Sequence, residues 1–362
     1  MTAPIWPWAD SHQSSDWPWL HIVSTSTILA KGVNYRVCAF AHLPEIDGQI
    51  MKALVTGANG FLGHAVWLRL NSMSGMQALG SVRRPPELTG ETVIEMGDLT
   101  PQTDWSLSLD GASVVVHLAA RVHVMNDDEI NPLSVFRLIN VSSTLNLARQ
   151  SAAAGVKRFV FISSVKVNGE YTLPMQAFNE TDASNPQDAY GQSKHEAEVG
   201  LRQISAETGM EVVIIRPPLV YGPGVKANFA ALMRAVQKGW PLPLGAVHNQ
   251  RSLVALDNLV DFIIICIDHP KAANQTFLVS DGQDLSTTEL LKGMAKAAGV
   301  PSRLLPIPVW ALQTAASVLG KGDVIQRLCG NLQVDISKAR NLLGWTPPIS
   351  VEEGLRRAMK SI

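Results

Sequence analysis

The segment MKALVTGANGFLG, residues 51–63, decides the fold of this 362-residue chain. It opens on a short apolar run, Met51–Thr56, with the composition of a buried strand. Glycines follow with the spacing GxxGxxG: Gly57 permits a tight turn, Gly60 lets the backbone approach a pyrophosphate, and Gly63 permits close packing of helix on strand. A helix that starts here presents free N–H groups to the phosphates. The segment therefore predicts a strand, a dinucleotide-binding turn and a helix in succession.

The turn itself supplies the expected cofactor contacts: Gly57, Asn59, Gly60, Phe61, Leu62 and Gly63. The alternative is a turn that needs its glycines only for backbone conformation. An NAD site normally carries a carboxylate at the end of the second strand, but no Asp or Glu lies between Gly63 and Pro86. That strand ends instead at Arg83 and Arg84, whose guanidinium groups suit a 2′-phosphate. The sequence therefore favours NADP as cofactor, with NAD as the alternative.

Downstream of this turn, short apolar runs alternate with longer amphipathic ones. Strands are expected at 77–82, 92–96, 113–118, 158–163 and 211–216. Helices are expected from the glycine turn to about Met73, over Pro132–Ala154 and over Tyr190–Thr208. The alternation predicts an α/β fold with a doubly wound parallel sheet, the Rossmann arrangement. Four residues that follow the third and fourth strands are expected to contact the cofactor: Asp98 and Leu99 at the adenine ring, Ala119 and Ala120 through their backbone.

Three regions are expected along the chain. Residues 51–217 are assigned to the dinucleotide-binding domain, and residues 218–362 mainly to a smaller, mixed substrate-binding subdomain from which the chain can cross back to the sheet. Residues 1–50 differ from both, because four of the nine tryptophans fall within the first twenty positions and no helical or strand period persists. We expect a poorly ordered extension, such as an early start codon would add. The alternative is a Trp-rich tail that binds a partner.

Composition excludes several classes of protein. A formal net charge of −1 lacks the basic footprint of a nucleic-acid-binding domain. Three distant cysteines without CxxC spacing suggest neither a disulfide framework nor a metal site, and suit a reducing cytoplasm. The longest apolar run, Phe262–Ile267, is too short to span a bilayer and predicts one buried stretch of helix. Because Pro306 and Pro308 interrupt the apolar segment Leu304–Leu319, no stable membrane insertion is expected.

A second pattern predicts proton-transfer chemistry. Tyr190 and Lys194 stand four residues apart in an expected helix, so their side chains share one face. A lysine ammonium beside a phenol lowers the pKa of the phenol from about 10, which makes tyrosine useful near neutrality. Ser164 ends the fifth strand, where ligands collect in such sheets, and its hydroxyl can bond a substrate carbonyl or alcohol. A YxxxK spacing alone also fits an ordinary exposed helix face, but the glycine turn and the strand-end serine favour a catalytic set.

From residue 51 to about 360 the chain resembles the extended short-chain dehydrogenase/reductase family, in its NAD-dependent epimerase/dehydratase group. The matching motifs are TGANGFLG (56–63), GDL (97–99), HLAA (117–120), ISSVKVNGE (162–170), YGQSK (190–194), RPPLVYGPG (216–224) and LGW (343–345). The resemblance implies a UDP-linked sugar as substrate and a nucleotide diphosphate held by the C-terminal part. It also implies that Ser164, Tyr190 and Lys194 are the catalytic residues. By analogy, the helices that begin at Pro132 and Tyr190 fit the pairing of a homodimer.

The resemblance also assigns individual substrate contacts. Arg251 matches the arginine that family members aim at the substrate diphosphate, and its structural alternative is an ion pair with Asp257 or Asp261. Asn228 matches a polar position that faces the nucleotide sugar. One departure from the family pattern stands at Leu219, where many members carry an asparagine. A polar substrate contact is therefore lost there, and the sugar nucleotide stays open.

Three reactions share this scaffold. Dehydration is disfavoured because Val165 and Lys166 replace the acidic pair that dehydratases carry after the strand-end serine or threonine. The carboxylate-free second strand favours a single hydride transfer from NADPH. The stretches SSVKVNGE (163–170) and RPPLVYGPGVKANF (216–229) also resemble bacterial surface-polysaccharide reductases. That resemblance implies the preferred interpretation, reduction of a UDP-4-keto-6-deoxy-N-acetylhexosamine in surface-polysaccharide biosynthesis. The alternative is a UDP-glucose or UDP-N-acetylglucosamine 4-epimerase that retains NAD. A non-catalytic NADP-binding protein is a distant alternative, because the chain keeps Tyr190 and Lys194.

Overall fold

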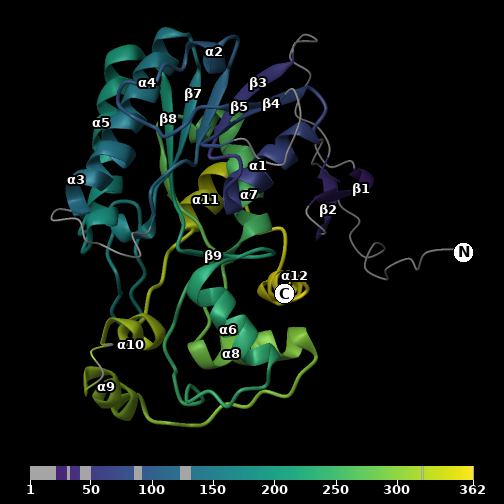
Figure 1. Ribbon diagram of the computed structural model, residues 1–362, viewed down its shortest axis with the longest axis vertical. Coiled ribbons are helices and arrows are strands. Elements are labelled where there is room, and N and C mark those ends of the chain that lie inside the picture. The colour runs from purple at the N-terminus through teal and green to yellow at the C-terminus, as the bar shows by residue number, and fades with distance from the viewer. Residues whose placement is uncertain are drawn as a thin grey trace, which may run out of the picture. The chain divides into compact units, whose positions relative to one another are not determined.

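The computed structural model describes residues 22–30, 33–40, 50–84, 92–122, 132–318, 320 and 322–361 (Figure 1). The chain divides into two compact units, residues 1–49 and residues 50–362. Among the described residues, every helix belongs to the second unit.

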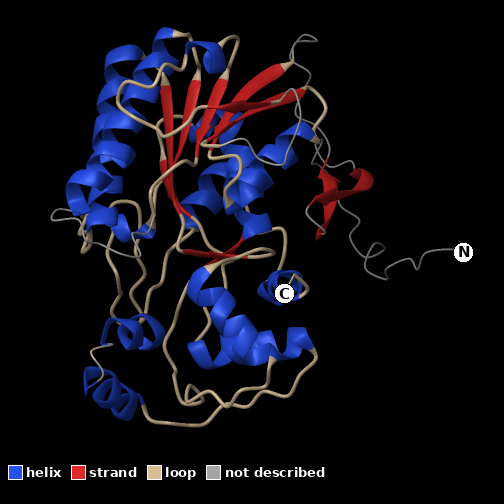
Figure 2. Ribbon diagram, viewed as in Figure 1, coloured by secondary structure: helices blue, strands red, loops and turns tan. Residues whose placement is uncertain are grey.

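The first unit contains an antiparallel pair of strands, β1 (Ile22–Ala30) and β2 (Val33–Phe40) (Figure 2). This pair differs from the expectation that no strand period persists before Met51. Both segments are rich in β-branched residues and stand two residues apart, which is a sequence signal of a hairpin. The four early tryptophans lie outside the described residues. The predictions of a poorly ordered extension and of a partner-binding tail therefore stay predictions.

The second unit is built on a seven-stranded parallel sheet with the order β11-β8-β7-β6-β3-β4-β5 (Figure 2). The strands are β3 (Met51–Thr56), β4 (Met76–Val82), β5 (Val93–Glu95), β6 (Val114–His117), β7 (Arg158–Ile162), β8 (Glu211–Arg216) and β11 (Thr276–Leu278). The chain leaves β3 first toward β4 and β5, and later toward β6, β7 and β8. The reversal is the switch point at which doubly wound sheets bind ligands. The predicted Rossmann fold is confirmed.

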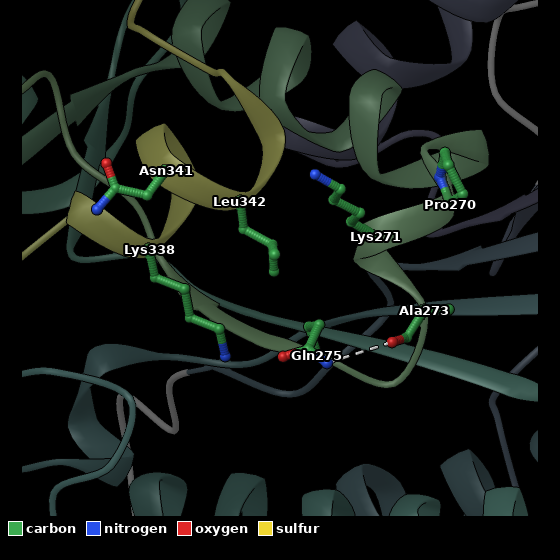
Figure 3. A pocket seen from close by; sticks show the side chains of 7 residues that line it. All are labelled: Pro270, Lys271, Ala273, Gln275, Lys338, Asn341 and Leu342. Carbon is green, nitrogen blue, oxygen red and sulfur yellow. Dashed lines mark hydrogen bonds between the residues drawn. The ribbon is translucent and has the colours of Figure 1, made fainter.

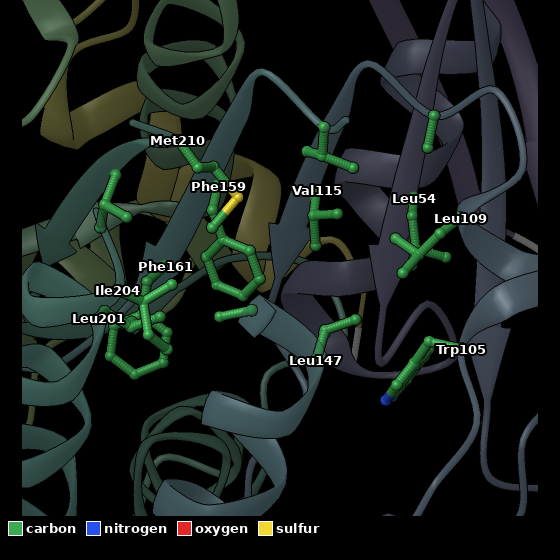
Figure 4. Packing of buried hydrophobic residues seen from close by; sticks show 14 of the residues in the cluster. Leu54, Trp105, Leu109, Val115, Leu147, Phe159, Phe161, Leu201, Ile204 and Met210 are labelled. Carbon is green, nitrogen blue, oxygen red and sulfur yellow. The ribbon is translucent and has the colours of Figure 1, made fainter. Parts of the chain in front are cut away.

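The middle of the sheet is buried on both faces, and every residue of β6 and β7 is buried. One face packs with α2 (Ser106–Leu109), α4 (Ser143–Ala153) and α5 (Ala189–Thr208) around a core whose sheet residues include Leu54, Val115, Phe159 and Phe161 (Figure 4). Arg158 points to the opposite face, where its Nη1 atom donates to the carbonyl oxygen of Cys266 at 3.1 Å. Cys266 belongs to α7 (Leu256–Asp268), which packs against α1 (Phe61–Asn71). Covered faces explain why these strands form continuous apolar runs in the sequence.

The helix predicted over Pro132–Ala154 is present but interrupted. It runs as α3 (Pro132–Phe136), a π-helical segment (Arg137–Ser142) and then α4. The α5 helix is continuous, and Asp188 caps it by accepting a hydrogen bond from the backbone nitrogen of Gly191 at 2.6 Å. A π-helical segment inside a helix is often a functional feature, and this one faces the candidate site.

The remaining residues form a second layer below the sheet in Figure 1. Its parts are β9 (Leu219–Tyr221), β10 (Leu253–Ala255), α6 (Ala227–Gln237), α8 (Thr287–Ala298), α9 (Val309–Val318), α10 (Gly322–Cys329) and α12 (Val351–Met359). β9 and β10 pair parallel in a small sheet of their own. The chain also returns to the large sheet, with α7 on one face and α11 (Ser337–Leu343) beside β11 at the edge. The predicted buried stretch Phe262–Ile267 lies within α7 and is confirmed.

Among the described helices, none combines the length and the apolar character needed to cross a bilayer. The apolar segment that begins at Leu304 forms α9 after Pro306 and Pro308. The two prolines thus precede the helix, where they leave its hydrogen bonds intact.

A protein that begins at Met51 should keep the melting temperature and turnover of the full chain, because all seven strands of the parallel sheet lie in the second unit. Differential scanning calorimetry and an activity assay on both proteins measure this. A melting temperature lower by several degrees, or lost turnover, would show that residues 1–50 are integral to the fold.

Candidate functional site

The glycine turn is tightly packed against its surroundings. A Cβ on Gly57 (φ 70°) would lie 3.0 Å from the backbone nitrogen of Ala119, in the loop that follows β6. A Cβ on Gly63 would lie 2.1 Å from the carbonyl oxygen of Gly57, so α1 starts in contact with the turn. Asn59 and Gly60 are exposed at the start of α1, and Phe61 and Leu62 form its first turn. An exposed turn at a helix N-terminus is a site that a pyrophosphate can approach.

A buried histidine holds the next loop of the cofactor site. The Nδ1 atom of His117 lies 2.8 Å from Oγ1 of Thr56, and its Nε2 atom lies 2.9 Å from Oγ1 of Thr144. Oγ1 of Thr56 also accepts hydrogen bonds from the backbone nitrogens of Leu118 and Ala119, both at 3.1 Å. Burial, with a smaller contribution from the nearby charge of Lys194, lowers the pKa of His117 to about 3. The network fixes the backbone at Ala119 and, through it, the position of Ala120.

The residues predicted for the adenine end lie together at the ends of β4 and β5. Arg83 and Arg84 are exposed, and Nε of Arg83 lies 3.7 Å from Oδ1 of Asp98. Leu99 instead packs partly buried against the core of the sheet. Because Arg83 and Asp98 are both exposed, their pairing adds little stability and leaves them accessible to a cofactor. The assignment of the arginines to a 2′-phosphate stays a prediction.

Ser164 stands where β7 ends. It caps a short 3₁₀ turn (Val165–Val167), and its Oγ atom accepts a hydrogen bond from the backbone nitrogen of Lys166 at 3.2 Å. The backbone nitrogen of Val165 donates to the carbonyl oxygen of Pro217 at 3.0 Å. This bond joins the end of β7 to the end of β8. Ser164 is partly exposed, as a residue that contacts substrate must be.

Tyr190 and Lys194 lie in the first half of α5 on the predicted common face. The Nζ atom of Lys194 donates to the carbonyl oxygen of Ile162 at 2.8 Å and lies 4.4 Å from the centre of the Phe161 ring. It lies 5.9 Å from the centre of the Tyr190 ring. The structure therefore brings Lys194 and Tyr190 to the end of β7, beside the turn that carries Ser164.

The expected lowering of the pKa of Tyr190 is wrong for this structure. Burial, with the nearby carboxylate of Asp188, raises the pKa of Tyr190 above its ordinary value. Burial also lowers the pKa of Lys194 to about 7, against the opposing effect of Glu198. Lys194 directs its ammonium at a carbonyl rather than at the phenol oxygen, and it is only partly charged at neutrality. A bound cofactor with a positively charged ring would change this balance toward the phenolate.

Asn140, which the sequence analysis missed, lies in the π-helical segment and is buried. Its Oδ1 atom accepts from the backbone nitrogen of Arg121 at 2.9 Å, and its Nδ2 atom donates to the carbonyl oxygen of Arg121 and to Oγ of Ser193, both at 3.0 Å. One side chain therefore links the loop after Ala120 to the helix of Tyr190 and Lys194. The one signal in the sequence was an amide residue inside an otherwise helical run.

The predicted substrate contacts lie in the second layer. Arg251 is largely buried, and its Nη1 atom donates to the carbonyl oxygen of Gly330 at 3.1 Å. The alternative ion pair is wrong, because Asp257 pairs with Arg357 at 3.0 Å and Asp261 accepts a hydrogen bond from Trp345 at 2.9 Å. Arg251 therefore forms an ion pair with neither Asp257 nor Asp261.

Asn228 and Leu219 are both exposed, on α6 and β9. Ala227, directly before Asn228, has a φ of 55°. Backbone strain of this kind in a residue other than glycine is commonly retained at functional sites. The positions of both residues are compatible with contact to a ligand, and their roles stay predictions.

A pocket of about 600 Å³ opens elsewhere, at the β11 edge of the sheet (Figure 3). Its lining residues are Pro270, Lys271, Ala273, Gln275, Lys338, Asn341 and Leu342. None of the predicted site residues lines it. The candidate site is therefore located by the strand ends and the hydrogen bonds around them rather than by this pocket.

Comparison with known proteins agrees with the resemblance found in the sequence. Residues 53–280 match the NAD dependent epimerase/dehydratase family. A UDP-glucose 4-epimerase of Vibrio cholerae is 49% identical over 309 residues, which cover 85% of this chain and 94% of that protein.

Solved structures share the fold. UDP-glucuronic acid 4-epimerase from Bacillus cereus in complex with NAD has a TM-score of 0.70 at 22% identity, over 86% of this chain and 96% of that one. RMD from Pseudomonas aeruginosa complexed with NADPH has a TM-score of 0.66 at 21% identity, over 86% and 99%. At such identities the likeness shows the fold alone.

The neutral, buried His117 predicts a specific loss of stability in acid. Its pKa is about 3 in the folded protein against 6.5 for a free histidine, so between these values the unfolded state binds a proton that the folded state does not. Stability from this group is complete above pH 6.5 and falls as the pH decreases, by up to about 1.4 kcal/mol per pH unit. Urea unfolding from pH 7 to pH 4.5 should therefore show a steeper loss for the parent than for His117→Gln. Equal slopes would contradict a buried neutral imidazole.

Proposed function

Because the chain belongs to the NAD dependent epimerase/dehydratase family, we propose that it is a 4-epimerase of a UDP-linked hexose. The observation that carries the proposal is the 49% identity to a UDP-glucose 4-epimerase along 85% of the chain. The sequence analysis preferred a UDP-4-keto sugar reductase and kept the epimerase as its alternative. The comparisons favour that alternative, and UDP-glucose and UDP-N-acetylglucosamine are the substrates of choice.

NAD is the cofactor that this proposal requires, and the residues of the glycine turn fit a dinucleotide. A Cβ on Gly60 would lie 3.1 Å from the carbonyl oxygen of Gly57, a tight contact that favours glycine at this exposed position of the turn. At the adenine end, the carboxylate of Asp98 faces Arg83. That exposed pair does not decide between the cofactors, and NAD is supported by the relative's reaction, because an epimerase returns the hydride to the same sugar and consumes no NADPH. When bound at this turn, NAD would supply the hydride acceptor for C4 of the sugar and then the hydride donor for the opposite face of the ketone.

The protein's own residues move the proton and hold the sugar. Tyr190, as phenolate, takes the proton of the C4 hydroxyl and gives it back when the ketone is reduced. Lys194 favours the phenolate by its charge and holds the ribose next to the nicotinamide. Ser164 donates a hydrogen bond to the C4 oxygen.

Arg251 and Asn228 hold the nucleotide part in this proposal. A guanidinium has five N–H donors, and Arg251 gives one to Gly330, so others can reach a diphosphate. Asn228 offers an exposed amide at the start of α6.

We place the protein in the cytoplasm as a homodimer. Cys266 and Cys329 are free thiols, which fits a reducing compartment. On the helices expected to pair, Leu138 of the π-helical segment and Val199 of α5 are each about half exposed. Covering such apolar side chains is what a helix-to-helix dimer interface would do.

The two arginines after β4 give a test of cofactor choice. The variant Arg83→Ala, Arg84→Ala should lose NADPH affinity by tenfold to a hundredfold, about 1.5–3 kcal/mol, because it loses a charge-assisted contact to the 2′-phosphate. NAD and NADH affinity should barely change, since they lack this phosphate. Calorimetric titration of parent and variant with each cofactor measures this. If NADPH binds both proteins alike, the assignment of the arginines fails.

The catalytic assignment and the choice of reaction are tested together. Tyr190→Phe should reduce turnover by about 10²–10⁴-fold while it leaves the fold and cofactor binding intact, because only the proton-transferring oxygen is removed. Lys194→Ala should also weaken cofactor binding, and Ser164→Ala should reduce turnover less than either. Nucleotide-sugar chromatography and absorbance at the nicotinamide band are the measurements.

The epimerase requires that UDP-glucose and UDP-galactose, or their N-acetyl forms, interconvert with no net change in nicotinamide absorbance. Stoichiometric oxidation of NADPH by a UDP-4-keto sugar, without such interconversion, would instead establish the reductase. Parental turnover in Tyr190→Phe would reject the catalytic assignment for either reaction.

A further inference from the structure

Lys166 occupies an unusual place, two residues after Ser164 in the 3₁₀ turn at the end of β7. Its side chain is 28% exposed, and its Nζ atom donates to Oε1 of Glu170 at 2.7 Å and to the carboxylate of Asp188. In the sequence, Lys166 is one of the two residues that disfavour dehydration. In the structure its ammonium bridges two carboxylates beside the site.

The bridge joins the two elements that carry the proposed catalytic residues. Asp188 caps α5, two residues before Tyr190, through the hydrogen bond that it accepts from Gly191. A Cβ on Gly191 would lie 2.9 Å from the carbonyl oxygen of Lys166, so the 3₁₀ turn and the first turn of α5 touch through their backbones. The position of Tyr190 relative to Ser164 is set at this contact.

The bridge between Lys166 and Asp188 also affects the electrostatic surroundings of Tyr190. Burial is the larger cause of the raised pKa of Tyr190, and the carboxylate of Asp188 adds to it, since a negative charge opposes a phenolate. Burial acts to raise the pKa of Asp188, but hydrogen bonds from Lys166 and Gly191 and the charges of Lys166 and Arg327 lower it overall. Asp188 therefore stays ionised, and the adjacent ammonium of Lys166 offsets its charge.

We propose that Lys166 is a positioning residue, which ties the Ser164 turn to the first turn of α5 through Asp188 and offsets the Asp188 charge beside Tyr190. The inference rests on the proposed function, because it takes Tyr190 as the proton-transfer group. The substrate is the UDP-sugar of the proposed function, and Lys166 acts through Asp188 rather than on the sugar.

Several other charged groups face this region and stay unchanged in the test. They are Lys194 and Glu198 of α5, Glu170 after the 3₁₀ turn, Arg327 of α10 facing Asp188, Arg251 facing Glu170, His117 of β6 facing Lys194, and the Arg137–Glu196 pair on the outer side of α5. Because all variants share them, differences between variants report Lys166 and Asp188.

The test compares pH profiles of kcat/KM for the full-length parent and five variants. Lys166→Met removes the ammonium, Lys166→Arg keeps the charge, and Asp188→Asn keeps an oxygen that caps α5 but removes its charge. The fourth is the double variant Lys166→Met, Asp188→Asn. The matched control is Lys296→Met, which breaks a lysine–glutamate pair with Glu352 (2.8 Å) between α8 and α12.

The expected shifts follow from the charges. In Lys166→Met, the limb of the profile that reports Tyr190 should move to a pH about one unit higher. At pH values below that limb, kcat/KM should then be about tenfold lower than in the parent. In Asp188→Asn the limb should move to a lower pH. The limb of the double variant and that of Lys166→Arg should lie close to the limb of the parent. The whole profile of Lys296→Met should coincide with the parent's. A lower rate in Lys166→Met without a shift of the limb would overturn the proposal. So would a double variant whose limb stays where it is in Lys166→Met. A merely structural defect does not move the limb in opposite directions in the two single variants.

A second readout separates this inference from the proposed function. Tyrosinate absorbance of the NAD-loaded protein can be titrated with pH, and the transition missing from Tyr190→Phe belongs to Tyr190. That transition should shift between Lys166→Met and Asp188→Asn as the rates do. If the parent shows no epimerase activity, the proposed function fails. Even then, opposite shifts of the Tyr190 transition in Lys166→Met and Asp188→Asn would support the role of Lys166. Titration curves that coincide in the two variants would refute it.

Discussion

Parallel pairing of β3 with β6 and of β6 with β7 aligns Thr56, His117 and Phe161 side by side in the register of the sheet. The chain therefore leaves all three strands at one edge, and the glycine turn, the loop after β6 and the Ser164 turn meet there. These segments are separated by some sixty and forty-five residues of sequence, so it is the pairing of the strands that brings them together. His117 stabilises the alignment by bonding to Thr56 on one side and Thr144 on the other. A neutral imidazole can do this in a place where a charged group would be costly.

Buried charges behind Tyr190 are balanced in pairs. Glu198 is fully buried and accepts hydrogen bonds from Arg216 and Ser163, which joins α5, β8 and β7. Burial of Lys194 lowers its pKa to about 7, and the charge of Glu198 acts against that decrease. The site is thus close to the point at which Lys194 gains or loses its proton. A nearby anion raises the pKa of Lys194 and a nearby cation lowers it, so the charge of Lys194 at neutrality depends on what lies beside it.

The sequence predicted the sheet better than it predicted the site chemistry. The strands Met51–Thr56 and Glu211–Arg216 were placed correctly because continuous apolar runs there end at glycine and proline. β11 was not placed, because three residues at the edge of a sheet leave no periodic signal. The π-helical segment escaped notice for a related reason, since its sequence continues an ordinary helical run. The raised pKa of Tyr190 could not be predicted from its spacing to Lys194, because it depends on burial and on where the ammonium points.

Lys166, which stands where dehydratases carry an acidic residue, and Leu219, the departure from the family pattern, lie at the same junction. Lys166 belongs to the turn after β7, and Leu219 follows β8 by three residues. The bond from Val165 to Pro217 holds these segments together at the backbone. The cofactor side, by contrast, keeps the glycine turn and the HLAA loop in their family form. Leu219 is exposed three residues after β8, so a difference in the sugar's surroundings from members that carry an asparagine is expected to originate at this position.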